Sequence, residues 1–281
     1  MADQKKRNVL SFEAIDNSND LKKYLDMGSR LNSSQFLYQY TTVSALINML
    51  RSQTMHLSNA KHMNDQLEYR NGDPQIWKNL FFSCFMMEDD ESIGMWGMYA
   101  QPWREGVKIS IPKETLRRWV NETSELIEIS QKTKQPTGRK ISDKSVFRVW
   151  ISTVAYSNFE ELETKSVAET LRCGGQENRI LRNVPHRPEL TGYIKDMAWI
   201  YEKEVRVKAY FENEDAFERV AIKMPDYVIN SLIITPSPLF EGNIIEQIKA
   251  EISRSIITDK SKFVDKLLIR SACDNCSIAQ K

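Results

Sequence analysis

The stretch EVRVKAYF (residues 204–211) alternates between charged and apolar side chains, and this alternation constrains the fold more than any other feature of the sequence. Successive side chains of a β-strand point to opposite faces of a sheet, so a period of two predicts a strand. One face holds the odd-numbered, apolar residues, and the other holds Glu204, Arg206 and Lys208. A strand with one apolar and one charged face is typical of an antiparallel sheet.

Similar short segments recur along the chain and are interleaved with helical patterns. A threonine cap at Thr42 precedes one such helix. We expect further strands at 36–42, 54–60, 79–85, 106–112, 148–157, 219–225 and 231–238. We expect helices from 43, within 113–129, 158–172 and 191–203, and a loop at 131–145. This pattern predicts an α+β fold. We expect one catalytic domain at 35–250, between a polar lead-in (1–34) and a C-terminal helix and tail (251–281).

The charge balance excludes a global electrostatic argument for binding to nucleic acid or membrane. Thirty-nine basic and 38 acidic residues leave a formal net charge of +1. No apolar run approaches the length of a membrane span, and the N-terminal residues contain no apolar signal region. Four cysteines without such a signal favour a reducing compartment over a disulfide framework. We therefore expect a cytoplasmic protein with no membrane partner.

Several well-known catalytic patterns are absent from the sequence. It contains no glycine-rich Rossmann fingerprint, no Walker loop and no Gly-x-Ser-x-Gly turn. The three histidines are not spaced as zinc ligands. One Cys-x-x-Cys pair, Cys273 and Cys276, supplies half of a zinc site at most, so we favour a thiol pair without a structural role and expect no metal.

Glu202 and Glu204 stand two residues apart where WIYEKEVRV enters the predicted strand. Two carboxylates on one face raise each other's pKa unless water or a cation compensates them. One interpretation is a solvated outer face, which is common in antiparallel sheets. The other is a pair facing a cleft, where one carboxylate stabilises an oxocarbenium-like sugar centre and the other orients a ribose hydroxyl or the nucleophile. Arg206 would then offset part of their repulsion.

Polar and aromatic residues recur at the ends of the first two predicted strands. Tyr38 and Tyr40 share one face of the first strand, and Ser58 and Asn59 end the second. The tyrosines fit cross-strand packing. They also fit a pocket wall that stacks a flat ring while neighbouring polar groups hydrogen-bond a ribose or an amide.

Two further segments carry candidate residues. The turn MNDQLEYR holds Asn64, Asp65 and Glu68, and Asx residues in turns usually bond their own backbone. Trp96 and Tyr99 are three apart and would share a face of a short helix. Such aromatic pairs belong more often to a core than to a ligand clamp.

The order of these segments carries more information than any one of them. It runs from a tyrosine-bearing strand (LYQYTT) through an Asn-Asp-x-x-Glu turn (NDQLE), a Ser-Cys-Phe strand (FFSCF) and a Met-Trp-x-x-Tyr helix start (MWGMYA) to a Tyr-Glu-x-Glu-x-Arg strand (YEKEVR). Over about residues 36–210 this order resembles a bacterial family of uncharacterised cytoplasmic proteins. That family in turn resembles, more distantly, the ADP-ribosyltransferase fold.

The resemblance implies a mixed, mostly antiparallel split sheet with flanking helices. The first strand of that fold carries His or Arg where this chain has Tyr40, which is a departure. Its second strand carries Ser or Tyr near Ser58. Its late strand ends in a catalytic Glu, often as Glu-x-Glu, which places the catalytic role on Glu204.

The function implied by the resemblance is that of an NAD-dependent ADP-ribosyltransferase, a glycosyltransferase of the toxin or phage-defence kind. Glu204 would stabilise the positive charge as the glycosidic bond breaks, and Glu202 would position the acceptor. The resemblance also implies NAD-binding roles for aromatic and polar residues: Tyr38, Tyr40, Trp96 and Tyr99 around nicotinamide, and Ser58 and Asn64 on ribose or amide groups. An antitoxin protein is a possible partner of such a toxin.

The acceptor is RNA, DNA or a protein side chain, with nucleic acid slightly favoured. The reason is the locally basic loop 131–145, which with Arg117, Arg118 and Trp119 would form a phosphate-binding rim. A solvated loop fits the same residues.

Two other functions remain open from the sequence. The pocket could recognise a nucleotide or a nucleic-acid end without catalysis. Alternatively, Glu202, Glu204 and Asp65 could surround a divalent metal in a hydrolase or nuclease.

Overall fold

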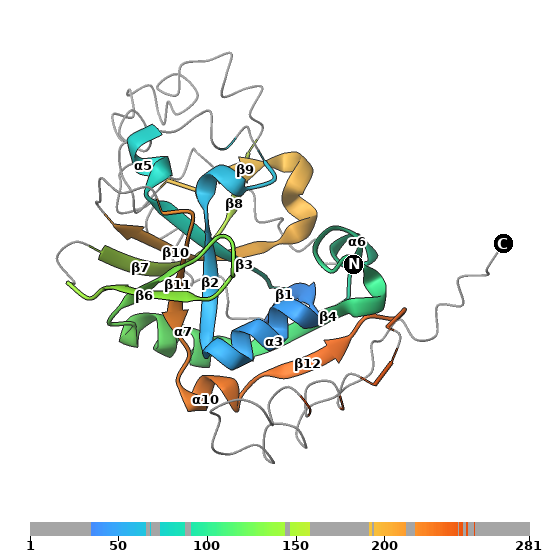
Figure 1. The fold of residues 1–281 in the computed structure, drawn as a ribbon. Helices are drawn as coiled ribbons and strands as arrows, with labels where there is room; N and C mark the ends of the chain where they lie inside the picture. Colours follow the sequence, from blue (N-terminus) through green and yellow to red (C-terminus); the bar gives the residue numbers. More distant parts are fainter. Residues whose placement is uncertain are drawn as a thin grey trace, which may run out of the picture.

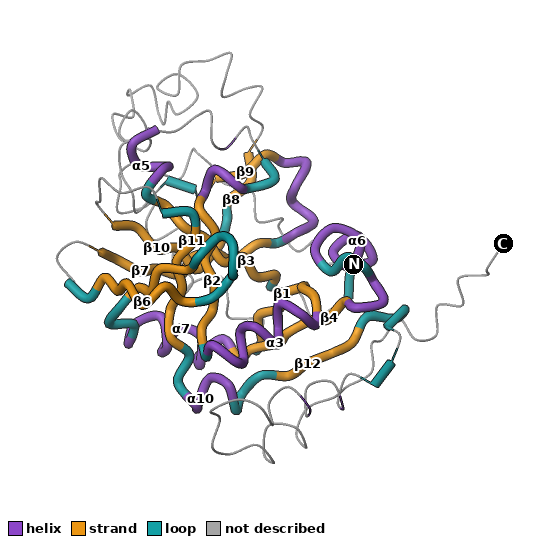
Figure 2. The backbone as a smooth tube through the Cα atoms, in the orientation of Figure 1, coloured by secondary structure: helices purple, strands orange, loops and turns teal. Residues whose placement is uncertain are grey.

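A computed structural model of the 281-residue chain describes residues 35–65, 68, 74–87, 91–143, 147–157, 191–192, 194–211, 217–240, 242–243, 246 and 250. Within these residues ten strands form one antiparallel sheet, and two more form a short parallel pair. Strands dominate the centre and short helices lie around them (Figures 1 and 2). The predicted α+β fold, with a mixed and mostly antiparallel sheet and flanking helices, is confirmed.

The strands of the large sheet follow the order β12-β4-β1-β3-β2-β11-β5-β6, and β10 pairs with both β3 and β7. Their bounds are β1 Phe36–Thr42, β2 Thr54–Asn59, β3 Leu80–Met86, β4 Gly106–Pro112, β5 Leu126–Ile129, β6 Pro136–Ile141, β7 Phe147–Thr153, β10 Glu204–Phe211, β11 Arg219–Lys223 and β12 Ile233–Pro236. The parallel pair consists of β8 (Ala155–Ser157) and β9 (Ile194–Asp196).

The sheet splits along one edge of β3. β10 pairs along the whole length of β3, so β1 and β2 share the opposite edge. β1 meets that edge at Met86, and β2 meets it at Phe81 and Phe82. Between the two contacts the side-chain amide of Gln39 donates to Ser83 Oγ at 3.1 Å. The split opens a space on the sheet, bounded by the ends of β1 and β2.

One face of the sheet carries the main hydrophobic core. Helix α3 (Val43–Ser52) connects β1 to β2, is capped by Thr42, and buries Val43, Leu46 and Leu50. Helix α7 (Lys113–Glu122) contributes further apolar residues, and α10 (Asp226–Ile229) lies beside it. The odd-numbered residues of β10 belong to the same core, as the alternation predicts. Burial of this face fixes the register of β10, because a shift by one residue would turn its charged side chains into the core.

The opposite face of β1 is covered by a second, shorter helix. Helix α6 (Ile93–Tyr99) begins at the N-cap Ser92, whose hydroxyl accepts from the backbone N–H of Met95. Trp96 packs against Tyr40 edge to face, with ring centroids 4.8 Å apart. The helix closes one side of the space created by the split.

Three expectations about secondary structure are wrong in part. The helix expected across 113–129 ends at Glu122, and the chain continues as β5. The loop expected at 131–145 contains β6, which pairs with β5 as a hairpin. The helix expected across 191–203 contains β9 followed by a 3₁₀ helix, η6 (Met197–Glu202). In each case strand pairing decides the structure, and local pattern does not report it: β5 pairs with β11, β6 pairs with β5, and β9 pairs with β8.

Several predictions lie outside the described residues. They concern the lead-in 1–34, the helix at 158–172, the C-terminal segment 251–281 and the pair Cys273 and Cys276. The domain boundaries therefore stay predictions. Across the part of the chain that the structure describes, no helix has the length and apolar character to cross a membrane.

Candidate active site

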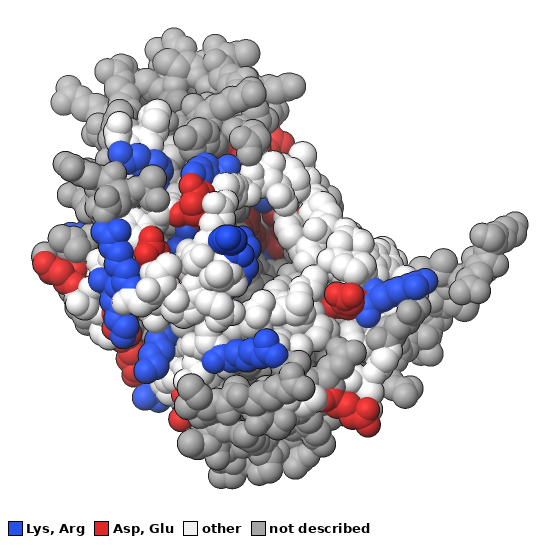
Figure 3. Space-filling model, in the orientation of Figure 1, with Lys and Arg blue, Asp and Glu red and all other residues white. Residues whose placement is uncertain are grey.

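A cavity of about 340 Å³ lies at the split, lined by parts of β1, β2, β3 and α3. Small-molecule sites typically measure roughly 300–1,000 Å³. Figure 3 shows a hollow on this face of the molecule, with acidic and basic side chains at its edge. Seven of the eight predicted site residues line the cavity: Tyr38, Tyr40, Ser58, Asn64, Tyr99, Glu202 and Glu204.

The two glutamates reach the cavity from different elements. Glu202 is the last residue of η6, and Glu204 is the first residue of β10. Lys203 between them adopts a left-handed conformation, with φ of 42°. The expectation that both glutamates lie on one strand is therefore wrong, because the strand begins only at Glu204. The reversal at Lys203 nevertheless turns both carboxylates toward the same space.

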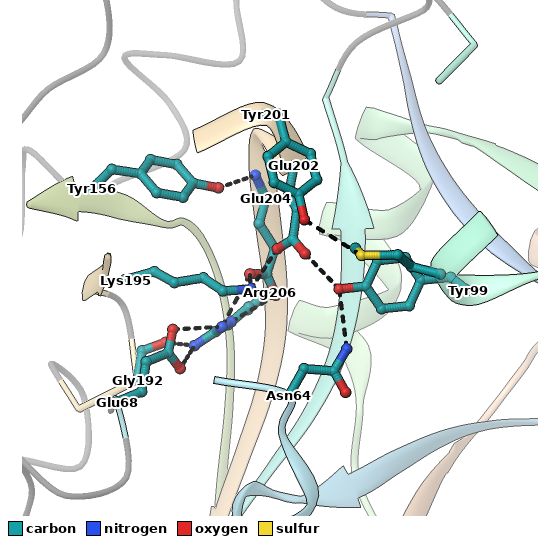
Figure 4. Close-up of polar contacts among 11 residues, drawn as sticks. Asn64, Glu68, Tyr99, Tyr156, Gly192, Lys195, Tyr201, Glu202, Glu204 and Arg206 are labelled. Atoms are coloured by element: carbon teal, nitrogen blue, oxygen red, sulfur yellow. Dashed lines mark hydrogen bonds and ion pairs between the residues drawn. The ribbon is translucent and has the colours of Figure 1, made fainter. Parts of the chain in front are cut away.

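A lysine lies between the two carboxylates. Lys195 Nζ donates to Glu202 Oε2 and lies 3.4 Å from Glu204 Oε2. In the β8–β9 pair, Lys195 is opposite Tyr156, whose hydroxyl accepts the backbone N–H of Glu204 at 2.8 Å. The short parallel pair thus positions the cation between the acids and fixes the start of β10 (Figure 4).

An arginine compensates Glu204 from the other side. Arg206 Nε and Nη2 donate to the two oxygens of Glu204 at 2.7 and 3.0 Å. The same guanidinium bonds both oxygens of Glu68, at 2.9 and 3.0 Å. The predicted role of Arg206 in offsetting the repulsion between acids is confirmed, and Glu68 is an additional member of the network.

The two carboxylates on Arg206 have opposite pKa shifts. Burial would raise the pKa of Glu204, but the charges of Arg206 and Lys195 outweigh burial and lower this pKa to about 2. Burial raises the pKa of Glu68 to about 7 despite the attraction of Arg206. Lys195 is a second cation that bonds Glu204, whereas the negative charge of Glu204 adds to the effect of burial on Glu68. Three buried carboxylates thus face two cations, Lys195 and Arg206.

The other end of the network is a tyrosine held by an asparagine. The hydroxyl of Tyr99 donates to Glu202 Oε1 at 2.5 Å and accepts from Asn64 Nδ2 at 3.3 Å. Burial, followed by the charge of Glu202, raises the pKa of Tyr99, so the phenol stays protonated and remains a donor. Asn64 therefore bonds across to helix α6, and does not merely close its own turn. Figure 4 shows the chain of contacts from Asn64 to Arg206.

Tyr38 and Tyr40 form one wall of the cavity, whereas Trp96 lies outside it. Tyr38 and Tyr40 line the cavity from β1, and the hydroxyl of Tyr40 accepts the backbone N–H of Ser92. Trp96 does not line the cavity and is fully buried behind these tyrosines. Its indole N–H donates toward Glu91 at 3.4 Å. The prediction that Trp96 contacts the cofactor is wrong, because the helix turns this residue into the small core that supports the wall.

The charged face of β10 is not solvated, so that interpretation of the acidic pair is wrong. Arg206 and Lys208 have no exposed surface. Lys208 donates to the carbonyl of Thr191 at 2.8 Å, and Arg206 donates to the carbonyl of Gly192. Gly192 has a φ of 78°, and a Cβ there would collide with the ring of Phe82. Only a glycine lets this segment approach the strand closely enough to receive both cations.

The arrangement of acids does not suit the metal-dependent alternative. That alternative needs Glu202, Glu204 and Asp65 to converge, and the described residues contain no cluster of three potential metal ligands. Lys195 and Arg206 already occupy the oxygens of Glu204. A metal ion placed there would meet two fixed positive charges, which is unfavourable at this burial.

The phosphate-binding rim predicted around loop 131–145 differs from the prediction at Trp119. Trp119 is buried, and its indole N–H donates to the carbonyl of Lys223, so it offers no stacking surface. Arg118 bonds Glu122 on the surface of α7. In the hairpin, Lys140 bonds Glu125 at 3.1 Å.

Lys195, Tyr156 and Glu68 were not predicted as site residues. A charge argument could have found the lysine, because a buried acid pair needs cations and Lys195 is the nearest basic residue upstream of Glu202. No such signal exists for Tyr156, whose role depends on the β8–β9 pairing.

Comparisons with known proteins give three distant structural likenesses. No family model matches the chain, and no curated protein matches it. The solved structure described as "Thermus sp. 2.9 DarT in complex with carba-NAD+" is 11% identical, with a TM-score of 0.34, over 86% of this chain and 97% of that one. The same protein with ADP-ribosylated ssDNA is 10% identical, with a TM-score of 0.32, over 78% and 88%. At these TM-scores the likeness establishes neither family nor activity.

Proposed function

We propose that this protein is an NAD-dependent ADP-ribosyltransferase whose reaction takes place in the cavity at the sheet split. The observation that supports the proposal is the convergence of Glu202 and Glu204 with the tyrosine-bearing wall of β1 on one cavity. An acidic pair and a wall for a flat ring are what cleavage of a ribosyl–nicotinamide bond requires.

In the proposed reaction, the bond between the ribose C1′ and the nicotinamide nitrogen breaks, and neutral nicotinamide leaves with the electron pair. Positive charge then develops on the ribose. Glu204, held ionised by Arg206 and Lys195, provides fixed negative charge next to that centre. An acceptor nucleophile forms the new bond to C1′ and releases its proton to solvent or to a neighbouring base. The bonds and charges of the step thus balance without a metal or a redox partner.

The remaining residues of the network would orient the reactants. Glu202, fixed by Tyr99 and Lys195, is placed to position the acceptor or a ribose hydroxyl. Ser58 and Asn64 supply further polar groups to the cavity, and Asn64 does so next to Tyr99. Because Tyr99 stays protonated, it holds Glu202 in one orientation through the reaction.

The direct test is transfer of label from NAD. The protein is incubated with NAD labelled in its adenylate half, together with DNA, RNA or cell protein in separate reactions. The proposal expects label on one acceptor class with the wild type and none with Glu204→Gln. Addition of EDTA should not change the result. Absence of transfer and of nicotinamide release with the wild type would refute the proposal.

A non-catalytic nucleotide-binding module is the second candidate, and one observation favours it. Every carboxylate oxygen of Glu202 and Glu204 already accepts a hydrogen bond from within the protein. A pair so fully compensated is suited to recognising a ligand without reacting. NAD binding that survives Glu204→Gln, with no turnover by the wild type, would favour this candidate.

The toxin role is tested by growth. Cells induced to express the wild type should stop dividing, whereas cells expressing Glu204→Gln should grow normally at equal protein levels. Equal growth of both would remove the toxin role and leave the enzymatic proposal to the transfer assay.

A further inference from the structure

The end of the cavity opposite the glutamates is basic, and three of its residues come from paired strands. His56 and Ser58 lie on β2, and Arg219 begins β11. In the β2–β11 register Arg219 is opposite Ser58, and Ala221 is opposite His56. All three of His56, Ser58 and Arg219 line the cavity. Cross-strand and diagonal neighbours on one face lie within reach of each other, so the three form one compact group.

Arg219 is the charged member of this group, and no carboxylate in the described part of the chain forms an ion pair with it. Among the described residues its guanidinium makes no hydrogen bond or ion pair, unlike Arg206, which is bonded to Glu68 and Glu204. Arg219 is partly buried, and burial lowers its pKa, with no carboxylate acting against that effect. Taking an arginine out of water without a partner is costly. An anion bound in the cavity would remove that cost.

His56 points to the same conclusion from a second observation. Its Nε2 atom is buried and has no hydrogen-bond partner among the residues that the structure describes. Burial, followed by the charges of Arg219 and Lys134, lowers the pKa of His56 to about 4, so the imidazole is neutral at pH 7. A neutral imidazole protonated on Nε2 can donate one hydrogen bond to an oxygen. A bound anion would satisfy this orphaned atom as well.

The surroundings favour an anion over a neutral ligand. Lys134, in the turn of the β5–β6 hairpin, is close enough to influence His56 electrostatically. The acids of the cavity lie at its other end, where Lys195 and Arg206 compensate them. The cavity is therefore divided into a compensated acidic end and an uncompensated basic end.

We propose that Arg219, with Ser58 and the unpartnered His56 Nε2, forms a phosphate-binding subsite that holds the diphosphate of the dinucleotide. The assignment rests on the proposed function for the identity of the ligand. A guanidinium binds two phosphate oxygens at once, and the serine hydroxyl and the imidazole each add one donor. Anchoring the diphosphate at the basic end would place the nicotinamide ribose toward Glu204 at the other end, since the two groups are joined covalently.

The test compares ligands that share parts of NAD. Calorimetry measures the affinity of the wild type for NAD, ADP, inorganic pyrophosphate and nicotinamide riboside, which lacks phosphate. Arg219→Gln should weaken NAD, ADP and pyrophosphate binding about tenfold or more and leave nicotinamide riboside within about twofold. Arg219→Lys keeps the positive charge but loses the paired N–H donors of the guanidinium. Its affinity for NAD, ADP and pyrophosphate should lie between those of the wild type and Arg219→Gln. Arg148→Gln, at an exposed position of β7 that does not line the cavity, is the matched control and should bind all four ligands like the wild type.

Each outcome bears on one proposal or the other. The phosphate subsite would be overturned if Arg219→Gln lowered the affinity for all four ligands equally, or lowered the affinity for none of them. It would also be overturned if the wild type failed to bind ADP and pyrophosphate at millimolar concentration. Binding of ADP that depends on Arg219, without any cleavage of NAD, would uphold the subsite and refute the transferase. Cleavage of NAD by Arg219→Gln with the KM of the wild type would refute the subsite and uphold the transferase. Circular dichroism and Tm of each variant verify that the fold is intact.

Discussion

Tyr156 and Lys195 lie opposite each other in the parallel β8–β9 pair, and both side chains reach Glu204. The tyrosine accepts the backbone N–H of Glu204, and the lysine bonds its carboxylate. Two short strands thus fix both the start of β10 and the charge balance of the acidic pair. The site is built on strand pairing as much as on the glutamates themselves.

Removing the cation between the acids should destabilise the protein. In Lys195→Met, Glu202 and Glu204 would face each other without the ammonium group that separates them. Breaking a buried ion pair by removing one partner costs about 3–5 kcal/mol. We expect a loss of that size in the free energy of unfolding, measured by urea denaturation at pH 7. Lys140→Met removes an exposed pair with Glu125 and should cost less than about 1 kcal/mol. Equal losses in the two variants would contradict the buried network.

The raised pKa of Glu68 should appear in the pH dependence of stability. The folded protein keeps a proton on Glu68 up to about pH 7, whereas an ordinary glutamate releases it near 4.5. Between these values the folded state binds more protons, so the free energy of unfolding should fall as pH rises. Glu68→Gln should flatten this decline and be more stable than the wild type at pH 8. Urea denaturation at pH 5 and pH 8 measures the effect, and parallel curves for the two proteins would show that Glu68 does not titrate in this range.

The lowered pKa of Glu204 has the opposite consequence. A depressed carboxyl pKa stabilises the folded state above the ordinary value of 4.5, and this contribution is lost as the pH falls toward 2. Glu204→Gln should therefore lose less stability than the wild type between pH 5 and pH 2. Thermal unfolding across that range provides the measurement. A larger loss of stability in Glu204→Gln than in the wild type between pH 5 and pH 2 would contradict the ion pairs around Glu204.

The hydroxyl of Tyr99 should matter for turnover and little for folding. Tyr99→Phe removes the donor that holds Glu202 Oε1 and leaves the ring in place. We expect the kcat of nicotinamide release to drop about tenfold, with Tm within a few degrees of the wild type. Tyr201→Phe is the matched control, because Tyr201 is exposed and, among the described residues, its hydroxyl bonds only the sulfur of Met98. Equal kcat in Tyr99→Phe and Tyr201→Phe would remove Tyr99 from the site.

Much of the fold could be predicted from the sequence, because its strands alternate and its helices are capped locally. The strand at 106–112 and the helix that begins after Thr42 lie where the pattern places them. The β5–β6 hairpin could not be predicted, since the exposed strand at 136–141 has no apolar face to reveal it. The alternation in β10 was itself ambiguous, because a buried charged face and a solvated one have the same period.

The candidate site, like the fold, could be predicted only in part from the sequence. Residues that lie in recognisable segments, such as Glu204 and Tyr99, were predicted to belong to it. Trp96 was misplaced by a single step around the helix, since residues three apart share a face only approximately. Lys195 and Arg219 were missed because strand pairing brings them to the cavity from segments with no distinctive pattern. Local sequence therefore identified the acidic pair and the neighbouring Arg206, and it missed the cations that distant strands bring to the cavity.

The rate of nicotinamide release from NAD tests the central claim most directly. We predict measurable release by the wild type and by Glu122→Gln, a surface variant on α7, and a rate at least about a hundredfold lower for Glu204→Gln. The affinity of Glu204→Gln for NAD should stay within a few-fold of the wild type. No release by the wild type, or equal release by the wild type and Glu204→Gln, would contradict the account.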